Sequence, residues 1–351
     1  MRRRADIPHS AVTIADVARA AGVATSTVSR ALTRPGRVSD AVRRRVETTA
    51  AELGYRPNPQ ARSLTSGRTH SIALLIPAAT NPYFFDLIRG TQAQAKASGY
   101  RHMLVDTEES AEIEAATLAE LASSVDGVVL TGSRLSDARL VEIAARLPMV
   151  VVNREIDGIP SVIVDTSTAI GEALEYLVSL GHGRVAFLAG PATSWSSRRR
   201  WQALGAAADR LRVECIRIGP FSSMRQSGAA AADAALHHGV TACLFFNDML
   251  ALDALKRFRE RGVAIPSAMS VVGCDDIFGA DFCDPPLTTL TAPIAEVGRV
   301  ATDMLLSRLG HSGPGIAPAR DRVRIPAHLT IRASTARCPL FVPGDSPSSG
   351  H

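Results

Sequence analysis

The hydrophobic and polar positions at the start of the chain predict three short amphipathic helices. The first begins at Thr13, which can form a capping box with Asp16, and it ends at Gly22. The second covers about residues 25–32, and the third carries its apolar face on to Leu53. Three short helices with a tight glycine turn between the first two are typical of a helix-turn-helix unit.

A further short helix is expected in the segment that follows this unit. Pro59 suits the first turn of a helix, and Gly67 would end it. A helix of this length is marginal on its own in water. The segment is therefore either a plain linker or a stretch that folds only against a partner.

From residue 72 onward, short apolar runs alternate with helical patterns. The predicted strands are residues 72–76, 125–130, 149–152, 162–164, 185–188, 215–218, 243–246, 270–273, 322–325 and 328–331. Helices separate the first three strands, another helix capped by Asp165 or Thr166 follows the fourth, and a last helix spans residues 293–309. Repeated strand–helix units predict an α/β fold with parallel sheets, covered by helices on both faces and split into two lobes.

Charge is distributed unevenly along the chain. The first 70 residues hold 13 arginines and five acidic residues, whereas the remainder holds 26 basic and 29 acidic residues. A basic head on a mildly acidic body points to a polyanion as the partner of the head alone. The longest uncharged apolar run, residues 71–80, is far shorter than the ~18 residues that span a bilayer, so neither a membrane segment nor a secretory signal is expected.

Sequence motifs of common enzyme classes are absent. The chain has no GxSxG, GxxxxGK[ST] or HExxH motif, and its five cysteines lack CxxC spacing, which indicates reduced thiols rather than a disulfide framework or a zinc site. Asp275 and Asp276 are adjacent, and neighbours on an extended segment point to opposite sides, so they rarely share one ion. The expectation is a protein with no catalytic residue, no metal and no cofactor.

The second helix carries residues suited to reading DNA. Thr25, Ser26 and, one turn later, Arg30 would face base edges in the major groove, where arginine can donate two hydrogen bonds to guanine. Phosphate contacts, which position a protein without specifying sequence, are expected from Thr13, Ser29 and Tyr55. The alternative is that Arg30 belongs to a merely solvated face.

Ordered motifs along the chain resemble the LacI/GalR (lactose-repressor-like) family of transcriptional regulators. In the head they are TIADVA (13–18), AGV (21–23), TVSR (27–30), LGYRPN (53–58) and ARSL (61–64). In the body they are NPYF (81–84), LGH (180–182), LAGP (188–191), ND (247–248), SVVG (270–273) and PLTT (286–289). The resemblance spans about residues 12–335 and implies a dimeric or tetrameric regulator; without leucine heptads in the tail, a homodimer is favoured.

The resemblance implies a role for the segment after the head. In the family, the part matching residues 59–66 is a hinge helix that orders on operator DNA and inserts a leucine into the minor groove. Leu64 matches that leucine, Ala61 lies one turn earlier, and Asn58 joins the implied DNA contacts. An apolar wedge of this kind unstacks a base step and kinks the duplex. The alternative for Leu64 is a linker residue that packs on the core.

The body resembles the periplasmic-binding-protein-like fold, in which two lobes close on a small ligand. Carried over by position, the effector contacts fall on Tyr83, Phe84, Asn153, Ser194, Ser196, Arg200, Phe221, Asn247 and Asp275. Amide, carboxylate and guanidinium groups suit the hydroxyls of a sugar, and aromatic rings suit its C–H faces. The alternatives are core positions for Phe84 and Phe221, a helix cap for Asn247 and a loop cap for Asp275.

Several positions depart from the family pattern. Ala78 stands where an acid is frequent, Asn153-Arg154 replaces an Asp-Arg pair, and Cys274 replaces a common aromatic residue. Fewer carboxylates shift the hydrogen-bonding preference of the site toward donors, which predicts an atypical effector. In the head, Ala24 replaces the usual serine, which weakens the helix cap by roughly 1 kcal/mol unless Thr25 substitutes.

These patterns together predict the domain organisation. A helix-turn-helix DNA-binding domain is expected at residues 11–56, a hinge helix or linker at 57–69, a ligand-binding and dimerisation core at 70–337 and a disordered tail at 338–351. Within the core, lobe 1 is expected from about residues 70–166 and 293–321, and lobe 2 from about 167–292 and 322–337.

The expected function is that of a cytoplasmic, nucleoid-associated repressor. Its partners would be double-stranded operator DNA, a sugar or sugar derivative as effector, and a second copy of itself, with no membrane. A transcriptional activator of the same fold, or a solute-binding protein without a DNA function, is the alternative.

Overall fold

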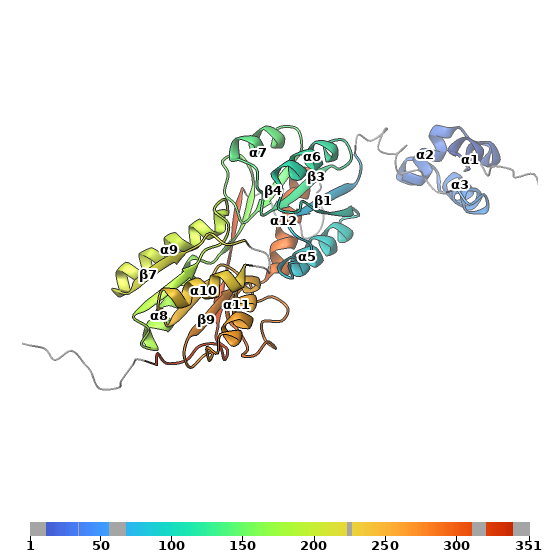
Figure 1. Ribbon diagram of the computed structural model, residues 1–351. Helices are drawn as coiled ribbons and strands as arrows, with labels where there is room; N and C mark the ends of the chain where they lie inside the picture. The colour runs from blue at the N-terminus through green and yellow to red at the C-terminus, as the bar shows by residue number, and fades with distance from the viewer. Residues whose placement is uncertain (1–11, 34, 56–67, 223–226, 311–320, 340–351) are drawn as a thin grey trace, which may run out of the picture. The chain divides into compact units, whose positions relative to one another are not determined.

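The computed structural model describes residues 12–33, 35–55, 68–222, 227–310 and 321–339 (Figure 1). The chain forms two compact units, Met1–Thr69 and His70–His351.

The first unit is a three-helix bundle with its own small core. It contains α1 (Ile14–Ala21), α2 (Thr25–Thr33), a 3-10 turn η1 (Pro35–Arg37) and α3 (Asp40–Glu52). Val17, Val28 and Val46, one from each helix, are fully buried against one another. The predicted capping box is confirmed: the Thr13 hydroxyl accepts from the Asp16 N–H, and the Asp16 carboxylate accepts from the Thr13 N–H. Gly22 ends α1 with a φ of +61°, a conformation that favours glycine.

One core residue of this unit was assigned wrongly from the sequence. Leu53 follows the end of α3 and is 39% exposed. Because the helix stops at Glu52, the helical spacing no longer directs the next side chain inward. Tyr55 packs against the core instead.

Lobe 1 of the second unit is built on a six-stranded sheet in the order β11-β5-β4-β3-β1-β2, in which every pair is parallel. The strands are β1 (Ser71–Ile76), β2 (Arg101–Asp106), β3 (Gly127–Thr131), β4 (Met149–Val152), β5 (Ser161–Asp165) and β11 (Arg322–Pro326). On β1, Ile72 and Leu74 pack beneath α5 (Tyr83–Ala97) and α12 (Ile294–Arg308). Ala73 and Leu75 face α6 (Ala111–Leu121) and α7 (Asp137–Ala144) on the opposite side. The two-residue period of a strand thus fills two helix-covered faces.

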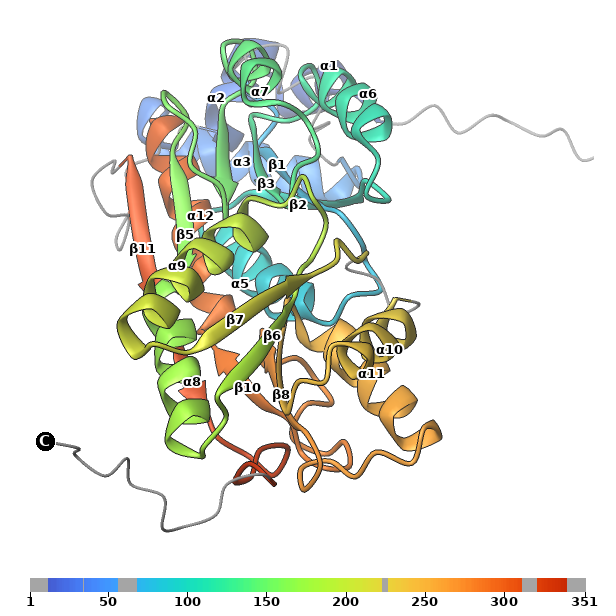
Figure 2. The same ribbon diagram turned by 60° about the vertical axis from the view of Figure 1, so that its left-hand side comes forward.

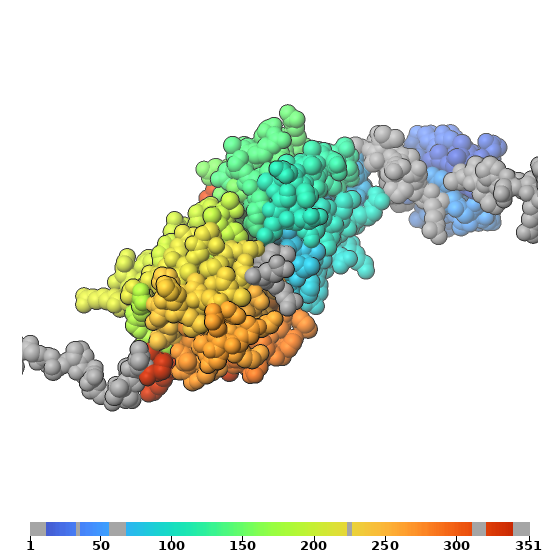
Figure 3. Space-filling model, viewed as in Figure 1, coloured from blue at the N-terminus to red at the C-terminus, as the bar shows by residue number. Residues whose placement is uncertain are grey.

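Lobe 2 repeats this plan in the order β12-β10-β9-β8-β6-β7, and only the β10–β12 pair among these is antiparallel. The strands are β6 (Arg184–Leu188), β7 (Glu214–Ile218), β8 (Ala242–Phe245), β9 (Ser270–Cys274), β10 (Thr288–Thr291) and β12 (His328–Thr330). Helices α8 (Ser167–Ser179) and α9 (Trp195–Leu211) cover one face, and α10 (Gly228–His237) and α11 (Asp248–Glu260) the other (Figure 2). The predicted two-lobed α/β core is confirmed, and its two masses are visible in the space-filling view (Figure 3).

The sequence prediction missed two strands and misplaced a third. β2 lies at an edge with most of its side chains exposed, so it lacks an apolar run, and β10 is a four-residue strand rich in threonine. β11 was expected in lobe 2, but its pairing with β5 places it at the edge of the lobe 1 sheet. The chain returns to lobe 2 only at β12, so that boundary lies at residues 326–328 rather than 321–322.

In the described part of the second unit, the chain crosses between the lobes three times, between β5 and α8, between β10 and α12, and between β11 and β12. At the first crossing, Thr166 occupies the N-cap position of α8 without a side-chain cap bond, and the carboxylate of the preceding Asp165 accepts from the Ser167 N–H at 3.0 Å. Three short crossings of this kind can act as hinges between two rigid bodies.

A strap formed by residues 334–338 closes the base of lobe 2. The Ser334 hydroxyl donates to the Val271 carbonyl oxygen at 2.6 Å, and the Ala336 carbonyl oxygen lies 3.1 Å from Nε2 of His182, which is buried. The Cys338 N–H donates to the Leu180 carbonyl oxygen at 2.8 Å. Cys338 was assigned to the disordered tail, but it is buried by this strap. Residues 340–351 of the predicted tail lie outside the described residues.

Candidate functional site

The exposed face of α2 presents the residues that the sequence assigned to base reading. Thr25, Ser26 and Arg30 are exposed, whereas Val28 and Ala31 on the opposite face are buried in the core of the first unit. Helical spacing therefore separates the packing residues of α2 from the polar residues that a duplex could reach. This arrangement suits a recognition helix.

The predicted phosphate contacts differ in their surroundings. Both donors of Thr13 are used within the capping box, because its N–H and its hydroxyl donate to Asp16 Oδ2 at 3.0 and 2.7 Å. These bonds hold the pKa of Asp16 below its usual value. Ser29 and Tyr55 are both half-buried. The implied hinge residues Asn58, Ala61 and Leu64 lie outside the described residues.

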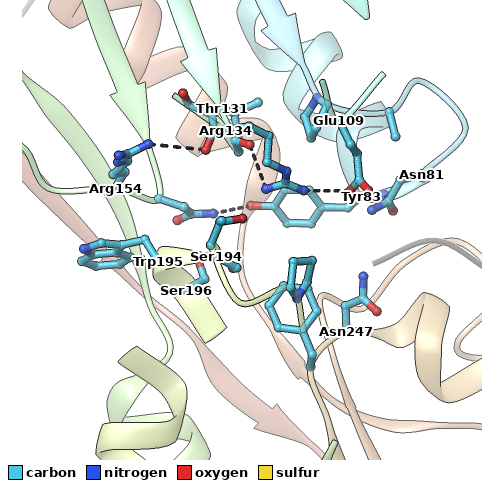
Figure 4. Close-up of a pocket in the computed structure, with 18 of the residues that line it drawn as sticks. Asn81, Tyr83, Glu109, Thr131, Arg134, Arg154, Ser194, Trp195, Ser196 and Asn247 are labelled. Carbon is cyan, nitrogen blue, oxygen red and sulfur yellow. Dashed lines mark hydrogen bonds and ion pairs between the residues drawn. The ribbon is translucent and has the colours of Figure 1, made fainter. Parts of the chain in front are cut away.

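The second unit has a cavity where its two sheets change strand order. In lobe 1 the chain adds β2 on one side of β1 and then β3 on the other side, and in lobe 2 it adds β7 and β8 on opposite sides of β6. Ligands commonly bind at such a switch point, at the carboxyl ends of the strands. Loops following β1, β3 and β4 meet loops following β6, β8 and β9 around a cavity of about 110 Å³ (Figure 4).

Eight of the nine residues assigned to effector binding line this cavity. They are Tyr83, Phe84, Asn153, Ser194, Ser196, Arg200, Asn247 and Asp275. Phe84, the second residue of α5, is also a core residue and is 5% exposed. Phe221 is not among the lining residues; it is half-buried against the lobe 2 core, as in the alternative interpretation.

Arg200 is the buried cation of the cavity. Its Nε donates to Thr166 Oγ1 at 3.3 Å, and its Nη1 donates to the carbonyl oxygen of Phe246. Its Nη2 lies 3.6 Å from Asp275 Oδ1. Because Thr166 lies at the first crossing between the lobes, Arg200 connects the ligand cavity to a hinge.

Asp275 is the matching buried acid. Burial raises the pKa of its carboxyl group to about 7, and the charge of Arg200 opposes this rise. Its neighbour Asp276 forms a separate ion pair with Arg332 at 2.7 Å, so the two acids have different cationic partners. Asp275 can therefore accept hydroxyl hydrogen bonds as a carboxylate above neutral pH.

Asn153 and Tyr83 form a fixed pair on the lobe 1 side. The Asn153 side chain donates from Nδ2 to the Tyr83 hydroxyl and accepts the Val164 N–H at Oδ1, both at 2.9 Å. Burial raises the pKa of the Tyr83 hydroxyl, so it remains protonated. The Tyr83 proton is therefore available as a donor to a ligand.

Two polar residues of the cavity also cap helices. The Asn247 side chain accepts the Leu250 N–H at 3.0 Å at the start of α11, as its alternative interpretation stated. The Ser194 hydroxyl accepts the Ser197 N–H at 3.2 Å at the start of α9. Capping occupies acceptor positions and orients each side chain, so a ligand would meet these two side chains in fixed orientations.

The sequence-based assignment missed other polar residues of the cavity. They are Asn81, Glu109, Thr131, Ser133, Arg134, Arg154, Thr193 and Trp195. Most follow the carboxyl end of a strand, which is the signal that could have identified them. Glu109 follows β2, the strand that the sequence prediction omitted.

Neither a membrane segment nor a metal cluster is found in the described parts of the chain. Among the helices described, none is long and apolar enough to cross a bilayer. Among the same residues, no group of three His, Cys, Asp or Glu side chains could hold a metal ion.

Comparisons with known proteins cover both units. Residues 13–58 match the bacterial regulatory proteins of the lacI family, and residues 174–335 match the periplasmic binding protein-like domain. The HTH-type transcriptional repressor CytR of Escherichia coli is 35% identical over 94% of this chain and 98% of its own length. The ribose operon repressor of Escherichia coli is 33% identical over 85% and 93%, respectively.

Solved structures agree with this relationship. The lac repressor dimer bound to operator and the anti-inducer ONPF aligns with a TM-score of 0.80 at 27% identity, over 93% of this chain and all of that chain. A LacI family regulator from Enterococcus faecium with bound ribose aligns with a TM-score of 0.67 at 28% identity, over 76% of this chain and 99% of that chain. The similarity thus covers both units and nearly the whole length of these relatives, and the chain belongs to the LacI family of bacterial transcriptional regulators.

Proposed function

We propose that the chain is a homodimeric repressor that works in the cytoplasm at the nucleoid. Its affinity for operator DNA changes when a sugar binds in the cavity of its second unit. The observation that carries this proposal is the combination of an exposed polar face on α2 with a two-lobed cavity lined by hydroxyl, amide, carboxylate and guanidinium groups. The relatives named repressors, and the relative solved with ribose, support it.

In the proposed DNA complex, Thr25, Ser26 and Arg30 read bases from the major groove. Ser29, Tyr55 and the start of α1 at Thr13 contact phosphates. The segment that carries Asn58, Ala61 and Leu64 is a hinge that enters the minor groove. Two copies of the head match the two halves of a pseudo-palindromic operator.

In the proposed sugar complex, the eight cavity residues assigned above hold the ligand. Arg200 gives the site a way to signal, because it touches both Asp275 in the cavity and Thr166 at a crossing between the lobes. A ligand that favours one arrangement of the lobes changes the spacing of the two heads, and by reciprocity DNA changes the affinity for the ligand by the same factor. The role is regulatory, with no reaction catalysed.

Selection from a random duplex library tests the DNA function. The full chain is expected to enrich a pseudo-palindromic sequence, and a panel of sugars is expected to include at least one that changes its affinity for that sequence. Retention no better than on random duplex, with or without sugars, would contradict the proposal. Stronger operator binding together with increased transcription would instead indicate an activator.

A further inference from the structure

The lobe 1 side of the cavity carries two arginines that the sugar-binding proposal does not use. Arg134 follows β3 and Arg154 follows β4, and both line the cavity opposite Ser194, Trp195 and Ser196 (Figure 4). Their side chains are only 15% and 16% exposed. Two guanidinium groups are thus largely withdrawn from solvent at the edge of one ligand cavity.

Arg134 is held in place but not saturated by its neighbours. Its Nη2 donates to Glu109 Oε1 at 2.8 Å and its Nη1 donates to the Gly132 carbonyl oxygen at 3.1 Å. A guanidinium group has five N–H donors, and these contacts engage two of them. The Arg134 backbone is fixed as well, because its N–H donates at 2.8 Å to Glu114, which is 1% exposed.

Arg154 is oriented from outside the cavity. Its Nε and its Nη2 both donate to Asp137 Oδ1, at 2.9 and 2.5 Å, and its Nη1 lies 3.4 Å from the Ser133 carbonyl oxygen. Asp137 is not among the residues lining the cavity, and it is 63% exposed. Asp137 pairs with Arg154 from outside the cavity, and these contacts engage three of the five N–H donors of the guanidinium group, which leaves two for a ligand.

Three cations and two acids line the cavity, and the third acidic partner, Asp137, lies outside the lining. The cations are Arg134, Arg154 and Arg200, and the acids are Glu109 and Asp275. Asp275 is only partly ionised near neutral pH, because burial raises its pKa to about 7. Two neighbouring positions, Ala78 and Asn153, are uncharged.

Two helices add partial positive charge at the same place. Helix α5 begins at Tyr83 and helix α9 begins at Trp195, and both residues line the cavity. The amino-terminal end of a helix favours negative charge. Unused guanidinium N–H donors and two helix ends at one cavity favour a ligand that carries negative charge.

We propose that the sugar bound here carries an anionic group, a carboxylate or a phosphate, and that Arg134 and Arg154 bind this group on the lobe 1 side. The planar donors of arginine match both anions with paired hydrogen bonds. The sugar hydroxyls then face Ser194, Asn247 and Asp275 on the lobe 2 side. This inference rests on the proposed function and specifies the class of sugar.

Calorimetry with matched ligands tests the inference on the full chain. The probes are sets of a neutral sugar, its uronate or aldonate, and its phosphate ester, such as ribose, ribonate and ribose 5-phosphate. At least one anionic member is expected to bind tenfold or more tightly than its neutral parent. If the gain in affinity is seen with the uronate or aldonate, the effector carries a carboxylate; if it is seen with the phosphate ester, the effector carries a phosphate.

Two variants and a control assign the gain to these arginines. Arg134→Gln and Arg154→Gln are each expected to reduce the affinity for the anionic sugar at least tenfold. The affinity for the neutral parent sugar should change less than twofold in either variant. Arg139→Gln removes an exposed arginine of α7 that pairs with Glu142, and it should leave both affinities unchanged. Equal weakening of both ligands would mean that the arginines only support the loops, which would overturn the inference.

The other outcomes separate the inference from the proposed function. If a neutral sugar binds as tightly as its anionic forms and alters operator affinity, the regulator proposal stands and the anionic inference is wrong. If no sugar of either kind binds while operator binding persists, the sugar-effector proposal fails and the inference fails with it.

Discussion

Arginine performs opposite roles at two positions of this chain. Arg30 is exposed on α2, whereas Arg200 is buried and directs its donors to Thr166, Phe246 and Asp275. The difference comes from the surroundings: in the proposed function the solvated guanidinium group of Arg30 reads bases, whereas the enclosed one of Arg200 connects parts of the structure. Both roles can be tested by single substitutions.

The exposed arginine should determine sequence preference. Arg30→Ala is expected to reduce the preference for the selected operator over random duplex by about 10- to 100-fold, because one bidentate base contact contributes about 1–3 kcal/mol. Titrations by fluorescence anisotropy at two salt concentrations would measure this. Weak, salt-sensitive binding should remain. Arg44→Ala, on the exposed side of α3, is the control for lost charge alone, and equal discrimination by both variants would contradict base reading.

The buried acid should make ligand binding depend on pH. Since the pKa of Asp275 is raised to about 7, its carboxylate is protonated progressively as pH falls below that value. The affinity for the sugar is expected to be constant above pH 8 and to fall as pH drops to 6, with Asp275→Asn abolishing the dependence. Calorimetry across this range is the measurement. A wild-type affinity that is flat with pH would mean that Asp275 does not accept a ligand hydrogen bond.

At the scale of elements, the amino-terminal end of α11 links three parts of lobe 2. Asp248 is fully buried there, and its carboxylate accepts from the Thr289 hydroxyl at 2.6 Å and from the Ile277 N–H at 3.0 Å. These contacts join α11 to β10 and to the loop after β9. Gly273 makes the approach possible, because a Cβ at that position would lie 2.0 Å from Asp248 Oδ1.

The burial of Asp248 should affect stability with a definite sign. Burial raises its pKa from 3.8 to about 6, so between these values the folded state binds more protons than the unfolded state. The contribution of this group to the unfolding free energy is therefore full below about pH 4 and is lost as pH rises to 6, by on the order of 3 kcal/mol. Denaturant unfolding of Asp248→Asn should lack this decline, and parallel curves for the variant and the wild type would contradict the assignment.

The capping box should stabilise the first unit. Thr13→Ala is expected to reduce its stability by about 1 kcal/mol, the usual value of a threonine cap. Hydrogen exchange of the backbone amides of α1 would measure this loss as a smaller free energy of helix opening. Thr48→Ala, at an exposed position inside α3, removes a hydroxyl without removing a cap and serves as the control. An equal loss in both variants would show that the cap itself contributes nothing.

The accuracy of the sequence analysis depended on the kind of element. Strands buried on both faces, such as β1 and β4, appear in the sequence as continuous apolar runs and were predicted within one residue. The edge strand β2 shows no such run, because most of its side chains meet solvent, and β11 could be placed only by its pairing with β5. Arg134 and Arg154 follow the ends of predicted strands, but only the sheet order shows that these two strand ends adjoin, so the sequence did not bring the two arginines to one cavity.

At the scale of the whole molecule, aromatic side chains remain exposed beside the cavity. Phe278 and Phe282 are 75% and 64% exposed, and their ring centroids lie 5.0 Å apart. Phe278 shares a groove with Phe85 of α5, which is 51% exposed, and with Asp275. Clusters of exposed aromatic residues are rare on monomeric proteins. In the proposed homodimer, we therefore expect the second copy to bury these side chains.

Removing this aromatic surface should separate the subunits. The double variant Phe278→Ser, Phe282→Ser is expected to sediment as a monomer at micromolar concentration and to bind operator at least tenfold more weakly, since two heads then no longer bind as one unit. Val141→Ser, which removes an apolar residue of α7 that is 46% exposed, is the control. A dimeric double variant would locate the subunit contact elsewhere on the second unit.

The late return of β11 and the strap has a consequence for synthesis on the ribosome. Lobe 1 lacks an edge strand until residue 326 has been made, and lobe 2 lacks β12 and the strap until residue 338 has followed. The three-helix head is complete, core included, by Tyr55. Nascent and prematurely terminated chains therefore carry a complete three-helix head and two incomplete lobes. Such fragments could bind DNA but would lack a folded cavity, so a metabolite could not regulate them.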